Sequence, residues 1–205
     1  MNLKQTLLAR FYDRFAAAGL REDVMAARML ELVGPEPRRV LHLGCGRGWL
    51  TRELARRFPR CEVIGVDIDP AIVAGAEDQA NPENVRYVVG AAEAPPVEGP
   101  FDAIVSSLLF HHLPRAAKRQ ALARGRELLA PGGRLIIADF GRPHDVVMRG
   151  AFLPVQLAHG FDDTADNLSG RYVELMREAG LRGAAELGRW RTPLGSVVLY
   201  QAVAA

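Results

Sequence analysis

The sequence contains little cysteine, little lysine and almost no net charge, and each of these shortages excludes a class of protein. Its only cysteines, Cys45 and Cys61, have neither the number nor the spacing of a disulfide framework or a zinc motif. Two isolated cysteines fit a reducing compartment. We therefore expect a cytoplasmic protein with no metal site.

The charges of the chain nearly cancel, because 26 basic residues stand against 24 acidic ones. No basic run is long enough to follow a phosphate backbone, and Lys4 and Lys118 are the only lysines. The longest uncharged apolar stretch, residues 103–114, is too short to cross a bilayer. We expect a small-molecule acceptor as partner, with no nucleic acid and no membrane insertion. Both a monomer and a homodimer agree with these observations.

Apolar runs alternate with helical patterns along most of the chain. A length of 205 residues and a hydrophobic content of 49% suit one domain, 1–205, around one core. The runs are continuously apolar, which is typical of a parallel sheet covered on both faces. The predicted strands are residues 40–43, 63–66, 85–89, 103–105 and 135–138; the predicted helices are 3–15, 22–33, 49–58, 70–79 and 116–129.

The end of the chain has a different pattern. A helix over residues 167–179 is followed by an extended segment at 183–191, the turn Thr192-Pro193-Leu194-Gly195 and an apolar run at 197–203. This pattern predicts an antiparallel hairpin. The expected architecture is α/β: a mostly parallel seven-stranded sheet with helices on both faces and an antiparallel C-terminal hairpin strand. Its parts are N-terminal helices (1–37), a cofactor-binding core (38–140), a lid or a packed helical cover (141–170), and a helix with the hairpin (171–205).

The strongest local signal is a glycine turn at the end of the first strand. It reads Val40-Leu41-His42-Leu43-Gly44-Cys45-Gly46-Arg47-Gly48 and leads directly into a helix. Glycine is needed where the backbone turns tightly or approaches a ligand closely. A dinucleotide fingerprint has its third glycine or alanine one position later, where this chain has Trp49. The turn therefore favours a nucleotide-like cofactor other than NAD.

An acidic residue follows the second strand. Asp67 comes about twenty residues after the glycine turn, where this type of fold has a carboxylate that binds ribose hydroxyls. The alternative is that Asp67 caps the helix that starts at Pro70. Asp69 is better placed for that role, because Pro at the first helical position favours an Asp immediately before it. We therefore assign Asp67 to ribose.

Four further motifs follow in order, and together with the glycine turn they resemble the class I S-adenosylmethionine-dependent methyltransferases. The resemblance is close over about residues 38–140 and is strongest to the small-molecule branch that includes the ubiquinone and menaquinone biosynthesis C-methyltransferases. It implies the Rossmann-like methyltransferase fold, S-adenosylmethionine as cofactor and S-adenosylhomocysteine as product. The motifs are Gly90-Ala91-Ala92-Glu93, Phe101-Asp102-Ala103-Ile104-Val105-Ser106-Ser107, Leu109-Phe110-His111-His112-Leu113 and Leu128-Leu129-Ala130-Pro131-Gly132-Gly133-Arg134-Leu135.

The resemblance also implies a set of cofactor-binding positions. The methionine part of the cofactor would lie over the glycine turn, the ribose would meet Asp67, and the adenine would lie between Ile68 and Ala92. Backbone near Ser106 would close over the methionine end. The whole implied set is His42, Gly44, Cys45, Gly46, Gly48, Asp67, Ile68, Ala91, Ala92 and Ser106.

The chain departs from the family pattern at two of these positions. Family members usually have an acid at the position of His42, where it holds the methionine ammonium group, and an Asp at the position of Ala91, where it meets the adenine amine. A neutral imidazole still accepts one hydrogen bond, whereas an alanine side chain accepts none. The resemblance to the methyltransferase class remains, but the missing acids at these two positions predict weaker cofactor binding.

Methyl transfer from a sulfonium needs alignment and exclusion of water more than it needs a base. If a base is used, His111 and His112 are the candidates, because the loop after the fourth strand borders the expected substrate space. The alternative is that both histidines cap and pack the start of a helix. The apolar residues of segment 141–170 favour an apolar or aromatic acceptor if that segment is a lid.

These observations favour an enzyme that transfers a methyl group from S-adenosylmethionine to an oxygen or carbon of a small, apolar or aromatic acceptor. The alternative is a non-catalytic or regulatory protein that binds S-adenosylmethionine, to which the missing acids at His42 and Ala91 point. An NAD-dependent oxidoreductase is disfavoured, because Lys118 follows no tyrosine at helical spacing.

Overall fold

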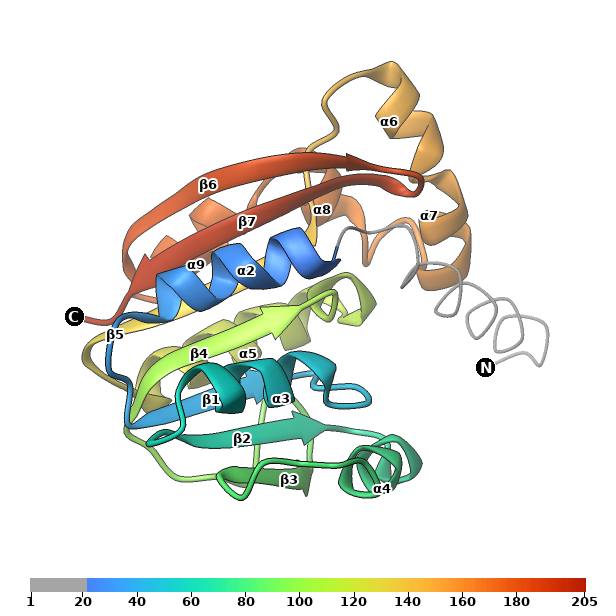
Figure 1. Cartoon of the computed structure of the whole chain (residues 1–205). Helices are drawn as coiled ribbons and strands as arrows, with labels where there is room; N and C mark the ends of the chain where they lie inside the picture. Colours follow the sequence, from blue (N-terminus) through green and yellow to red (C-terminus); the bar gives the residue numbers. More distant parts are fainter. Residues whose placement is uncertain (1–21) are drawn as a thin grey trace.

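A single seven-stranded sheet organises the residues that the computed structural model describes, 22–205 (Figure 1). The predicted helix at 3–15 lies outside these residues. The strands are β1 (Arg39–Leu43), β2 (Glu62–Asp67), β3 (Val85–Val89), β4 (Phe101–Ser107), β5 (Leu129–Phe140), β6 (Arg182–Thr192) and β7 (Gly195–Val203). The helices are α2 (Glu22–Val33), α3 (Trp49–Arg57), α4 (Pro70–Glu77), η1 (Phe110–His112), α5 (Arg115–Leu128), α6 (Val146–Ala151), α7 (Leu153–His159), α8 (Ala165–Ser169) and α9 (Tyr172–Glu178).

The first five strands are parallel and end at one edge of the sheet. The strand order is β3-β2-β1-β4-β5-β7-β6, and β1 pairs in parallel with both β2 and β4. Leu43, the last residue of β1, is level with Val66 of β2 and Ser106 of β4. The loops that follow β1, β2 and β4 therefore leave from the same edge, on the right in Figure 1.

Helices cover both faces of the sheet, as the continuously apolar strands predict. Alternate residues of each strand point to opposite faces. Val40 and Val105 contribute to a core beneath α2 and α3, whereas Leu41 and Ile104 contribute to a core beneath α5 and α9. All four of these side chains are fully buried, so each strand is held by packing on two sides.

The C-terminal hairpin is confirmed. β7 pairs antiparallel with both β5 and β6, and the Thr192 hydroxyl donates to the carbonyl of Gly195 at 2.8 Å across the turn. The prediction of one helix at 167–179 is wrong. Gly170 has φ +74°, a left-handed conformation that ends α8, and α9 starts afterwards.

Segment 141–170 contains the whole of α6, α7 and α8. Phe152 and Val155 are buried in the core beneath α2, so the segment is packed against the sheet. Leu153, Leu157 and Phe161 are exposed, and they give the same segment an apolar outer surface. None of the helices within residues 22–205 is long and apolar enough to span a membrane.

Candidate active site

The glycine turn forms a tight left-handed loop between β1 and α3. Gly44, Gly46 and Gly48 have φ values of +68°, +53° and +77°. The amides of Gly44 and Cys45 both donate to the carbonyl of Val66, at 2.8 and 3.0 Å, which ties the loop to the end of β2. Residues with a Cβ rarely adopt these angles, so the backbone itself requires glycine at all three positions.

The three glycines have different surroundings. A Cβ at Gly48 would lie 2.0 Å from the hydroxyl of Tyr87, and one at Gly44 would lie 2.8 Å from Leu109. A Cβ at Gly46 would have no described atom within 4 Å. The outer two glycines are therefore needed for packing within the protein, and Gly46 is the one that faces open space.

The carboxylate of Asp67 holds the loop in this shape. It accepts hydrogen bonds from the amide of Gly46 at 2.9 Å and from the amide of Asp69 at 3.2 Å. Asp69 caps α4, because its side chain accepts from the amide of Ala71 at 2.9 Å. The alternative role of Asp67 as the helix cap is therefore wrong. Ile68, the next residue, has 69% of its surface exposed beside the loop.

His42, near the end of β1, and Cys45, within the glycine loop, are both buried. The Nδ1 atom of His42 lies 2.9 Å from the hydroxyl of Thr51, and burial lowers the pKa of this histidine to about 3. His42 is therefore neutral at neutral pH. Burial also raises the pKa of Cys45 to about 12, with a further contribution from Asp67, so its thiol is not a nucleophile.

The remaining predicted cofactor positions lie at the same edge. Ala92 is buried after β3, and Ala91 is half-buried and forms a bridge to Ala94. Ser106 lies at the end of β4 and is fully buried; its hydroxyl has no hydrogen-bond partner within residues 22–205. The structure thus brings all the predicted positions to one edge, at the ends of β1 and β4 and in the loops after β1, β2 and β3.

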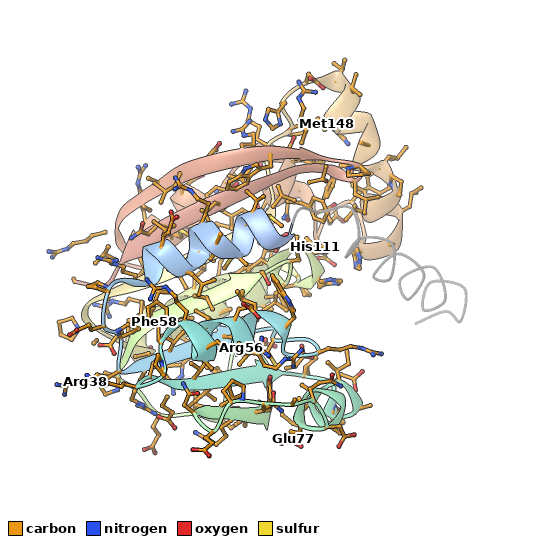
Figure 2. The ribbon with its side chains drawn as sticks, in the orientation of Figure 1. Arg38, Arg56, Phe58, Glu77, His111 and Met148 are labelled. Atoms are coloured by element: carbon orange, nitrogen blue, oxygen red, sulfur yellow. The ribbon has the colours of Figure 1, made fainter. Side chains whose placement is uncertain are left out.

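A buried carboxylate fixes His111. The Nδ1 atom of His111 lies 2.8 Å from Oδ1 of Asp139, and the two side chains are 2% and 0% exposed. Asp139 also accepts from the amides of His111 and Phe140. Because the carboxylate oxygen is the acceptor in this hydrogen bond, Nδ1 is the donor, and Nε2 is the ring nitrogen left for another partner. Figure 2 shows His111 at the edge where β4 ends, opposite Arg38 and Phe58.

Neither histidine caps a helix through its side chain. The residues that precede η1 and α5 are Leu109 and Pro114, and no side-chain cap is present at either start. His111 is packed, since its ring meets Phe140 edge-on with centroids 4.9 Å apart. Its Nε2 atom is buried and has no hydrogen-bond partner within residues 22–205. The alternative that the two histidines cap a helix is therefore wrong, whereas the packing that it also predicted is present at His111.

The sequence-based interpretation missed Asp139 and His159. Asp139 lies at the carboxyl end of β5, beside the strand that leads to His111, and an acid in that position is a usable signal. His159 ends α7, and its ring lies 4.2 Å from that of His112 and 5.2 Å from that of His111 (centroid distances). No local pattern links His159 to these two residues.

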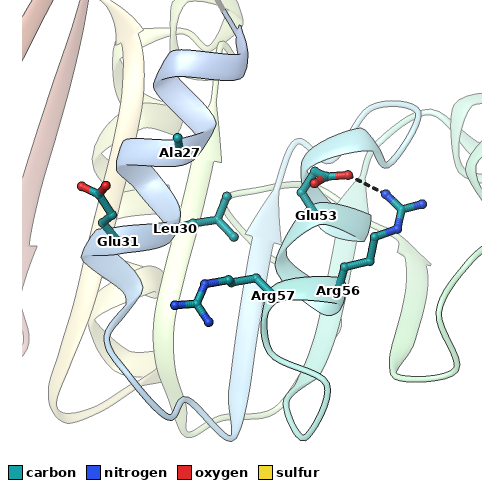
Figure 3. A pocket seen from close by; sticks show the side chains of 6 residues that line it. All are labelled: Ala27, Leu30, Glu31, Glu53, Arg56 and Arg57. Carbon is teal, nitrogen blue, oxygen red and sulfur yellow. Dashed lines mark hydrogen bonds and ion pairs between the residues drawn. The ribbon is translucent and has the colours of Figure 1, made fainter.

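An open groove of about 580 Å³ lies between α2 and α3, away from this edge (Figure 3). Leu30 of α2 points toward α3, and Arg56 pairs with Glu53 along the groove. Since α3 starts at the glycine loop, its last residues, Arg56 and Arg57, are at the far end of the helix from the candidate site. The groove is therefore separate from the glycine loop.

A parallel sheet that carries a glycine loop after β1 and a carboxylate after β2 defines a nucleotide-cofactor-binding protein of the Rossmann-like type. The methyltransferase domain family model matches residues 40–133. An uncharacterized methyltransferase of Geobacillus kaustophilus is 33% identical over 170 residues, which cover 80% of this chain and 77% of that protein. The chain belongs to the class I S-adenosylmethionine-dependent methyltransferases, and S-adenosylmethionine is the cofactor of this enzyme class.

Other similar proteins are named methyltransferases or share the fold. A malonyl-[acyl-carrier protein] O-methyltransferase of Paenibacillus sp. is 29% identical, covering 88% of this chain and 72% of that protein. A demethylmenaquinone methyltransferase of Deinococcus radiodurans is 31% identical, covering 64% and 55%. The structure of human N-acetylserotonin methyltransferase with S-adenosylmethionine matches with a TM-score of 0.67 and 17% identity, covering 82% and 48%. The chain thus spans about half the length of several proteins that it matches.

Proposed function

We propose that this protein transfers the methyl group of S-adenosylmethionine to an oxygen or carbon of a small, apolar or aromatic acceptor. The observation that carries this proposal is the position of His111. Its ring is held by Asp139, its Nε2 atom is buried without a partner within residues 22–205, and it lies at the sheet edge that carries the glycine loop. The expected site of the methyl donor and the proton acceptor His111 thus lie on the same edge of the sheet.

The cofactor would bind along that edge. The methionine part lies against Gly46, where the absence of a Cβ leaves space, and the ribose hydroxyls meet Asp67. The exposed face of Ile68 supports a position for the adenine against this residue, with Ala92 on the other side. The neutral imidazole of His42 takes the place of the usual acid near the methionine end, and Ser106 contributes buried polar surface there.

The acceptor class is supported by the surface of segment 141–170. This segment carries His159 next to His111, and it exposes Leu153, Leu157 and Phe161. Pockets for small molecules are mostly apolar with a few polar groups. Two relatives are named malonyl-[acyl-carrier protein] O-methyltransferase and demethylmenaquinone methyltransferase, and the first of these names specifies an oxygen acceptor.

In the proposed reaction, the acceptor atom attacks the methyl carbon as the bond from that carbon to sulfur breaks. The acceptor proton passes to Nε2 of His111, and Asp139 stabilises the imidazolium that results. The positive charge thus moves from the sulfonium to the imidazolium beside Asp139, and an apolar surrounding of the sulfur favours the transition state over the charged reactant. S-adenosylhomocysteine leaves as the second product.

The test is formation of S-adenosylhomocysteine with a panel of phenols, quinols and carboxylic acids as acceptors. We expect at least one acceptor to give turnover that His111→Gln lowers by about a hundredfold, which is the typical contribution of a general base. His144→Gln is the matched control, since His144 is exposed and bonds Ser196 instead of Asp139. Binding of S-adenosylmethionine without turnover on any acceptor would favour the non-catalytic alternative.

A further inference from the structure

Three of the five histidines of the chain meet at the carboxyl edge of the sheet. His111 and His112 come from η1, and His159 comes from the end of α7. One ring nitrogen from each lies within 4.8 Å of the other two. The ring centroids of the two neighbours His111 and His112 are 4.1 Å apart.

Each of the three rings offers one nitrogen to the same small space between η1 and the end of α7. An imidazole binds a metal ion through the lone pair of a ring nitrogen. The geometry of the cluster is therefore that of a set of metal ligands.

The surroundings of His111 are those of a metal-binding histidine. Metal-ligating histidines usually donate their second ring N–H to a carboxylate, which fixes the ring and makes the other nitrogen a better ligand. Asp139 is in that position, 2.8 Å from Nδ1. The opposite nitrogen, Nε2, is buried and has no hydrogen-bond partner within the described part of the chain.

We propose that His111, His112 and His159 form a binding site for one divalent transition-metal ion that prefers imidazole ligands, of the Zn²⁺ type. Zinc–nitrogen bonds of about 2.0–2.1 Å in a tetrahedral site place ligand nitrogens roughly 3.4 Å apart. Small side-chain rotations bring the three rings to that spacing. His112 is exposed and His159 half-buried, so these two move while His111 stays held by Asp139.

Three protein ligands leave a fourth position open, which is typical of catalytic and not of structural zinc. This role rests on the proposed function, because the open position lies beside the expected acceptor space. An acceptor hydroxyl bound to the metal loses its proton to water more readily, and its oxygen then attacks the methyl carbon as the carbon–sulfur bond breaks. In the metal-bound protein His111 is a metal ligand and not a base, and the metal ion activates the acceptor in its place.

The experiment uses the full-length, tag-free protein after treatment with a chelator. Zn²⁺ is titrated by calorimetry, and Co²⁺ by visible absorption, which reports coordination by protein nitrogen. We expect one ion per chain with a dissociation constant of about micromolar or lower. His112→Gln and His159→Gln should each weaken binding at least about tenfold, since even outer-shell changes cost that much. His144→Gln should leave binding unchanged.

Two results would overturn the proposal. One is the absence of Zn²⁺ binding at about 100 μM. The other is binding that His112→Gln and His159→Gln leave intact, because the ion would then be held elsewhere. Thermal unfolding of both variants, with and without S-adenosylmethionine, shows that they fold and bind cofactor. If S-adenosylmethionine stabilises the protein while Zn²⁺ fails to bind, only the metal site is rejected; if S-adenosylmethionine fails as well, the proposed function is rejected independently.

Discussion

Asp139 and His111 form a buried pair that joins the ends of β5 and β4. Oδ1 of Asp139 lies 2.8 Å from Nδ1 of His111, and neither side chain reaches solvent. Histidine rings held in this way have one defined tautomer, with the lone pair on the opposite nitrogen. The pair therefore leaves the opposite ring nitrogen, Nε2, for another partner, and this nitrogen is buried with no hydrogen-bond partner within residues 22–205.

Asp139→Asn tests Asp139 as a positioning residue. The amide cannot accept all of the hydrogen bonds from His111 and Phe140, so we expect turnover to fall by about a hundredfold and stability by about 1–3 kcal/mol. A purely structural role would lower stability and leave the pH profile of kcat unchanged. A shift or loss of the acidic limb of that profile, where activity falls as the general base becomes protonated, supports the positioning role.

Substitution of Gly48 should mainly lower stability, whereas substitution of Gly46 should mainly lower cofactor affinity. Gly48→Ala places a Cβ 2.0 Å from the Tyr87 hydroxyl, and overpacking typically destabilises by about 1–3 kcal/mol, so thermal unfolding should shift downward. Gly46→Ala meets no described atom within 4 Å, and it carries mainly the left-handed backbone strain of about 1–2 kcal/mol. We expect Gly46→Ala to fold and to lose cofactor affinity in calorimetry. Unchanged affinity would mean that the cofactor lies away from Gly46.

Asp67→Ala should weaken S-adenosylmethionine binding at least about tenfold, because charge-assisted hydrogen bonds contribute roughly 1.5–3 kcal/mol. The variant also loses the bond that holds the amide of Gly46. Asp69→Ala is the matched control: it removes the cap of α4 and about 1 kcal/mol of stability, and it leaves calorimetric affinity for the cofactor unchanged. Equal losses of affinity in both variants would contradict the ribose assignment.

The buried His42 predicts a defined loss of stability in acid. Burial depresses its pKa from 6.5 in the unfolded chain to about 3 in the folded one, so the unfolded state binds more protons between these values. The contribution of His42 is complete above pH 6.5 and is lost as pH falls toward 3, by at most about 1.4 kcal/mol per pH unit. The free energy of unfolding, measured with denaturant at each pH, should fall less steeply with decreasing pH for His42→Asn than for the wild type. Identical slopes would contradict the assignment.

The parallel core is predictable from the sequence because both faces of its strands are buried. Val40 and Leu41 point to opposite cores, so consecutive residues of the strand are apolar. Such a continuous apolar run can be recognised from the sequence alone. Gly170 was missed as a helix end, since an isolated glycine is also compatible with a continuous helix. His159 was missed because only the tertiary packing of α7 brings its ring to His111. The positions of the glycine loop follow from local geometry, whereas the histidine cluster follows from packing.

The most direct test of the account is thermal unfolding of the full-length protein with S-adenosylmethionine, S-adenosylhomocysteine or NAD. A ligand that binds only the folded state stabilises it by about 2.7 kcal/mol at a hundredfold excess over its dissociation constant. We predict an upward shift of the transition with the first two ligands and no shift with NAD. A shift with NAD alone, or no shift with either S-adenosyl compound at millimolar concentration, would contradict the assignment of the glycine loop to S-adenosylmethionine.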